Sequence, residues 1–128
     1  MFKEIKSSKD IKEFLDKTNS LHDGYIIGVQ YENNGITKTD CARYFDSEKT
    51  KLILRILVTS ISDAIIEIEF EDLLEWQIKD SQCDITDTSV IISAQKYIIW
   101  SDDVFSSTAE LGNGSFVIAK SMKWRITE

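Results

Sequence analysis

The alternation of hydrophobic and polar residues is clearest between Lys51 and Trp76. The run Lys51–Val58 is apolar on both alternating faces, apart from Arg55 in its interior. A run of this kind predicts a strand that is covered on both sides, or nearly so. A polar turn at residues 59–63 follows.

The strand predicted from Ala64 onward alternates strictly. Because side chains along a strand point to opposite faces in turn, one face belongs to the core and the other carries a row of carboxylates. A bulge at Asp72–Leu73 would preserve this alternation as far as Trp76. We expect this hairpin at the middle of an antiparallel sheet, with a core face of Ile66, Ile68 and Phe70 and an outer row of Glu67, Glu69 and Glu71.

An amphipathic helix is predicted over residues 8–18, because Ile11, Phe14 and Leu15 have the i, i+3, i+4 spacing. A serine just before it can cap its N-terminus. Tyr25–Tyr31 follows as the first strand, with a bulge or close backbone approach expected at Gly28.

The Asn33–Gly35 segment is a strong hairpin signal, and Ile36–Phe45 would be its return strand. Because this segment is polar and irregular, we expect either an edge strand or a partly extended loop. Further strands are predicted at Thr88–Ser93, Tyr97–Ser101 and Ser115–Thr127.

Lys120 falls on the apolar parity of the last strand. A bulge that turns it outward, or a snorkelled stem, explains this best. A buried cation with a functional role is the alternative. The absence of proline suits long hydrogen-bonded strands.

Together these elements predict a single α+β domain over residues 1–128. It would consist of one N-terminal helix and a curved antiparallel sheet of seven or eight strands, either a partly open barrel or a two-layer sandwich.

The net charge of −7 is unevenly distributed. Residues 63–87 hold nine acids and one base, a net charge of −8, whereas the remaining 13 acids and 14 bases give +1. Such a field repels nucleic acid and attracts basic surfaces. A merely solvated sheet face is the plainer interpretation. The residues expected to meet a basic protein partner are Glu67, Glu69, Glu71, Asp72 and Glu75.

No stretch reaches the roughly 18 apolar residues of a membrane span, and no signal peptide is evident. Cys41 and Cys83 are not spaced as metal ligands, and we expect them to be reduced thiols. These features favour a cytoplasmic protein that does not bind a membrane.

Catalytic motifs are lacking: the sequence contains no Gly-rich phosphate loop, CxxC, HExxH or GxSxG. His22 is the one histidine, and its neighbour Asp23 would point to the opposite face of a strand, which argues against an acid–base pair. A hydrogen bond from His22 to the backbone at the helix–strand junction is favoured over catalysis. We predict no catalytic residue, no cofactor and no metal site.

The three tryptophans each lie late in a predicted strand on an apolar parity, which favours core packing. The alternative is an aromatic ligand groove, formed by Trp100 and Trp124 if they line an open sheet face.

Three segments together resemble a family of small uncharacterised bacterial proteins of Firmicutes type: Leu21-His-Asp-Gly24, Ile99-Trp-Ser-Asp102 and Ala119-Lys-Ser-Met-Lys-Trp-Arg125. That family has a His-Asp pair near its start and an Ala-Lys-x-(Leu/Met)-Lys-Trp-Arg ending. The resemblance implies no activity. By class alone, small acidic proteins of this kind look like immunity proteins of toxin systems.

We therefore predict a non-enzymatic protein-interaction domain, monomeric or homodimeric, in the form of an immunity-type inhibitor of a basic toxin. The alternative is a small-ligand binding module at the tryptophans. A third hypothesis, an enzyme, would need His22 to converge with Asp23, Cys41 or another acid. His22, Asp23 and Lys120 are the residues whose role, functional or structural, the sequence leaves open.

Overall fold

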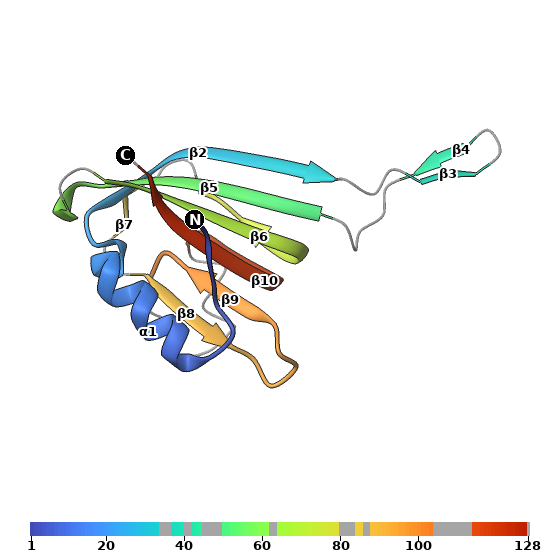
Figure 1. Cartoon of the computed structure of the whole chain (residues 1–128). Helices are drawn as coiled ribbons and strands as arrows, with labels where there is room; N and C mark the ends of the chain where they lie inside the picture. The colour runs from blue at the N-terminus through green and yellow to red at the C-terminus, as the bar shows by residue number, and fades with distance from the viewer. Residues whose placement is uncertain are drawn as a thin grey trace.

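The structure is a computed structural model, and it describes residues 1–33, 37–39, 42–44, 50–61, 64–79, 84–85, 88–103 and 114–127. It has one N-terminal helix, α1 (Ser8–Lys17), and a curved antiparallel sheet that is not closed (Figure 1). The predicted α+β class is confirmed.

Seven strands follow one another across the sheet in the order β7-β2-β5-β6-β10-β9-β8, and β1 pairs with β10 beside this path. Their bounds are β1 (Lys3–Glu4), β2 (Gly24–Asn33), β5 (Thr50–Val58), β6 (Ala64–Gln77), β7 (Asp84–Ile85), β8 (Ser89–Ile92), β9 (Ile98–Ser101) and β10 (Phe116–Thr127). Figure 1 shows α1 and the β8–β9 hairpin on the same side of the long strands. The predicted hairpin of β5 and β6 is the centre of the sheet.

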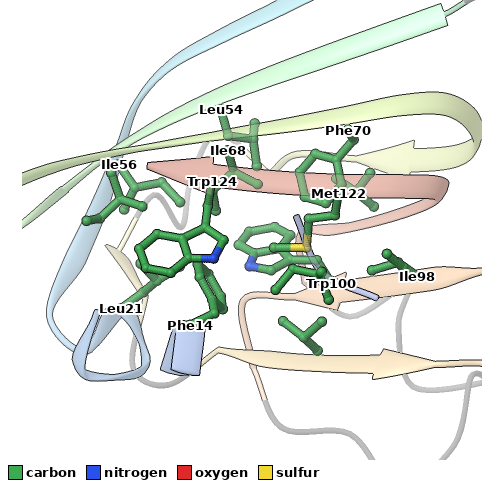
Figure 2. Close-up of a cluster of buried hydrophobic side chains, with 14 of the residues drawn as sticks. Phe14, Leu21, Leu54, Ile56, Ile68, Phe70, Ile98, Trp100, Met122 and Trp124 are labelled. Carbon is green, nitrogen blue, oxygen red and sulfur yellow. The ribbon is translucent and has the colours of Figure 1, made fainter. Parts of the chain in front are cut away.

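The core lies on the face of the sheet that α1 covers. Leu54, Ile68 and Trp124 share one row across β5, β6 and β10, and all three side chains are buried. Phe14 of α1 meets the Trp124 ring edge-on, with the ring centroids 5.3 Å apart (Figure 2). Burial of these side chains against one another is the main term that holds the helix to the sheet.

The helix begins and ends as its sequence indicates. Ser7 is the N-cap, where its hydroxyl accepts a hydrogen bond from the Asp10 N–H, and Thr18 ends the helix. A turn at Asn19–Leu21 with positive φ angles then leads into β2.

Two predicted bulges are present. The register between β2 and β5 shifts at Gly28, where an added Cβ would lie against the Arg55 side chain at 3.7 Å. Asp72 of β6 has φ of 58°, and the β6–β10 register shifts beside it between Ile118 and Ala119. Both irregularities increase the bend of long strands.

Two predictions about the sheet are wrong. In the predicted return strand Ile36–Phe45, the short strands β3 (Thr37–Thr39) and β4 (Ala42–Tyr44) pair with each other, and β2 pairs with β5 instead. The sequence of β3 has no apolar face to bury, whereas β5 has one. The outer face of β5 is not covered by the described elements: Ile53 and Leu57 are half-buried and Arg55 is exposed. Residues 34–36, including most of the Asn33–Gly35 turn signal, lie outside the described residues.

Candidate functional site

The predicted acidic row lies on the outer face of the sheet, but basic side chains accompany it. β5 and β10 flank β6, so Glu67 is opposite Arg55 and Arg125, and Glu69 is opposite Ile53 and Lys123. We call the paired residues the charge ladder; they are Lys51, Glu67, Glu69, Glu71, Lys123 and Arg125.

Glu69 is the centre of the charge ladder. Its carboxylate lies 3.0 Å from Nζ of Lys51 and 3.7 Å from Nζ of Lys123, and only 8% of the residue is exposed. The hydrogen bond to Glu69 raises the pKa of the Lys51 ammonium. Glu67 is 3.0 Å from the Arg125 guanidinium, and Glu71 is 3.5 Å from Lys123. These three glutamates therefore neutralise neighbouring cations and do not form a free acidic surface.

The other two predicted partner-binding acids, Asp72 and Glu75, make no ion pair with the described residues. They lie on the part of β6 that extends past its last pairing with β5, Lys51–Glu71. The bulge at Asp72 turns this extension, and Glu75 is exposed at its end. A negative charge therefore remains available here, beyond the charge ladder.

The same extension brings two aromatic side chains together. Trp76 of β6 stacks on Tyr31 of β2, with ring centroids 5.7 Å apart and ring planes at 24°. Both are exposed, Trp76 by 36% and Tyr31 by 49%, as is the neighbouring Leu74. We call Tyr31 and Trp76 the aromatic pair. Core packing was predicted for Trp76 and is wrong, because the β6 extension carries the ring beyond the reach of α1.

Trp100 and Trp124 occupy the interior. Trp100 is fully buried beside Phe70, with centroids 6.2 Å apart, and Trp124 is 3% exposed and lies against Phe14 (Figure 2). Core packing is confirmed for both. Neither ring lines an open sheet face, so the predicted ligand groove at these tryptophans is wrong.

His22 and Asp23 lie in the turn before β2. Asp23 has φ of 58°, and Nε2 of His22 is 3.5 Å from the Asp23 carboxylate. The prediction that the two side chains point apart assumed a strand and is wrong, because a turn does not alternate faces. The backbone carbonyls accept hydrogen bonds from the hydroxyls of Ser60 and Thr59. Both side chains are largely exposed, and the backbone of the pair joins the helix–strand junction to the β5–β6 turn.

Lys120 is turned outward, as predicted. In β10 the core-facing residues are first Val117 and Ala119 and then Met122 and Trp124, so the core-facing parity changes between Ala119 and Met122. Lys120 lies at this change of parity and is exposed.

Lys120 also lines a cavity of about 290 Å³ between β1, β10 and the turn that joins β8 to β9. Its lining is formed by Glu4, Ile5, Lys6, Glu71, Ile92, Lys96, Ile98, Lys120, Ser121, Met122 and Lys123. Four lysines and two glutamates give this cavity a local charge of +2 within a chain of net charge −7. The sequence carries no signal for it, because its lysines come from segments that only the fold brings together.

Among the residues that the structure describes, no group of three or more His, Cys, Asp or Glu residues could hold a metal ion. Cys41 and Cys83 lie outside the described residues. None of the helices that the structure describes is long and apolar enough to cross a membrane.

No family model matches the chain, and neither does any curated protein or solved structure. The resemblance to small bacterial proteins stays a prediction.

Proposed function

We propose that this protein is a non-enzymatic interaction domain whose partner binds at the aromatic pair and the adjacent acids Asp72 and Glu75. The observation that carries the proposal is the stacked, exposed pair of Tyr31 and Trp76. Tyrosine and tryptophan are enriched among the residues that dominate binding energy at protein interfaces. Their rings are already stacked in the free protein, so binding loses little side-chain entropy.

The chemistry of the partner follows from the surroundings of the pair. Asp72 and Glu75 have no ion pair among the described residues, and Leu74 between them is exposed. We infer a protein partner that presents basic side chains beside an apolar one. The acids would accelerate encounter electrostatically, while the rings would slow dissociation. An immunity-type inhibitor that covers a basic toxin is the form of interaction protein that we propose.

Affinity capture from a lysate of the source organism, followed by quantitative mass spectrometry, tests this function. One bait carries Tyr31→Ala with Trp76→Ala, and a second carries Asp72→Lys with Glu75→Lys. Ile91→Ala, which shortens an exposed residue of β8, is the matched apolar control. The charge-ladder control is Glu67→Arg with Arg125→Glu, which restores the ion pair in reverse.

We expect a basic protein that the wild type and both controls retain and that both test baits lose. The association rate of the purified pair should fall as salt rises, because salt screens exposed charges. Equal capture by all baits, or an association rate that salt leaves unchanged, would refute the proposal.

A further inference from the structure

Two separate segments share one edge of β10 and leave a gap between them. β9 pairs with residues 116–119 of β10, and β1 pairs with residues 123–124. The Ile5 N–H donates a hydrogen bond of 2.9 Å to the Met122 carbonyl and closes one side of the gap. Lys120 and Ser121 lie in the gap, and the 290 Å³ cavity is located there. We propose that this cavity is a binding site for a small organic anion with an apolar body.

The charge of the cavity supports an anionic head group. Each glutamate of the lining already has a lysine partner: Lys6 lies 3.0 Å from Glu4, and Lys123 lies 3.5 Å from Glu71. Lys96 and Lys120 have no ion pair with any described residue, so they provide the uncompensated charge. Two ammonium groups that line one cavity, Lys96 from the β8–β9 turn and Lys120 from β10, can donate hydrogen bonds to a single carboxylate or phosphate.

The floor of the cavity supports an apolar body. Ile5, Ile98 and Met122 form it, and each of these residues is at most 3% exposed. They belong to the main core, so the floor is rigid and already formed. Ligand pockets are typically about 300–1,000 Å³, which places this one at the small end. A head group with a body of a few carbon atoms suits that volume.

Lys96 is held in place by the β8–β9 turn. The Ser93 N–H donates to the Tyr97 carbonyl at 2.8 Å, and the Lys96 N–H donates to the Ser93 carbonyl at 2.9 Å. Lys96 has φ of 71°, in the left-handed region that favours glycine. Lys96→Gly therefore removes the charge and also relieves the turn, so this half of the double variant is not expected to destabilise the fold.

The experiment is a titration of the whole chain followed by ¹H–¹⁵N NMR spectra. The probes are hexanoate, hexyl phosphate, inorganic phosphate and the neutral analogue hexanol. The proteins are the wild type, the double variant Lys96→Gly/Lys120→Gln, and Lys9→Gln. Lys9 is an exposed lysine of α1 that lies outside the cavity, which makes it the matched charge control.

We expect hexanoate or hexyl phosphate to shift the amide signals of Lys120 and Ser121 saturably, and the preferred probe identifies the head group. The double variant should raise Kd at least about tenfold, equivalent to about 1.4 kcal/mol, while Lys9→Gln leaves Kd unchanged. Inorganic phosphate, which lacks the body, should bind more weakly. An unchanged Kd in the double variant, equal binding of hexanol, or no saturable shift with either organic anion would each overturn the inference. None of these results depends on the aromatic pair, so they leave the proposed protein interaction untouched.

Discussion

Breaking the charge ladder at Glu69 should reduce the stability of the protein measurably. The Glu69 side chain is 10% exposed, while that of Lys51 is 26% exposed at a distance of 3.0 Å. A fully exposed pair contributes about 0–1 kcal/mol, and breaking a fully buried one costs about 3–5 kcal/mol. Because the carboxylate is buried but the ammonium groups remain partly in water, we expect Glu69→Gln to lower the free energy of unfolding by about 1–3 kcal/mol.

A double-mutant cycle separates the ion pair from other effects of the substitution. Glu69→Gln and Lys51→Met should show a coupling free energy of about 1 kcal/mol in urea unfolding followed by circular dichroism. The internal control is Glu71→Gln with Lys123→Met, because Glu71 is 43% exposed and lies 3.5 Å from Lys123. Water and salt screen that pair, so its coupling should be below about 0.5 kcal/mol.

The pH dependence has a defined sign. The pKa of Lys51 is raised in the folded protein, so its contribution is fully present below the usual value of 10.5 and is lost as pH rises through the raised value. Equal coupling for the two pairs, or no loss of stability in Glu69→Gln, would refute the structural role of the charge ladder. Glu67, Glu69 and Glu71 would then again be candidates for contact with a basic protein partner.

Three further predictions concern buried and exposed side chains. Asp102 is buried with its carboxylate accepting the Ser115 N–H at 3.1 Å, and burial raises its pKa. Protonation of Asp102 therefore favours the folded state. The free energy of unfolding of the wild type should rise relative to that of Asp102→Asn as pH falls through the raised pKa towards the usual value of 3.8. A difference between the two proteins that does not change with pH would contradict this. Phe14→Ala should cost about 3–5 kcal/mol in urea unfolding, because it removes a fully buried ring from beneath Trp124, and a cost below about 1 kcal/mol would mean that α1 does not seal the core. Trp76→Phe should abolish most acrylamide quenching of tryptophan fluorescence, because Trp76 is exposed and the other two indoles are buried; unchanged quenching would place the accessible indole elsewhere.

The helix, the main strand segments and the central hairpin could be predicted because they depend on local patterns. The spacing of Ile11, Phe14 and Leu15 produces one apolar stripe whatever that stripe later contacts. The strict alternation in β6 likewise assigns Ile66, Ile68 and Phe70 to one face, since every strand has a side-chain period of two. The outward turn of Lys120 followed from the same rule, because a charged residue on an apolar parity requires a bulge or an exposed stem.

The partners of each side chain could not be predicted, because they depend on which strands become neighbours. Glu69 looked like a free acid until β5 and β10 placed Lys51 and Lys123 on either side of it, from positions 18 residues before and 54 residues after it. Trp76 is exposed because it lies on the part of β6 that extends past the last residue pair with β5. The cavity at Lys120 exists because β1 and β9 pair with one edge of β10 without meeting. Sequence periodicity determined the face on which each side chain lies, and tertiary pairing decided which charges are neutralised, which rings are exposed and where a ligand has room to bind.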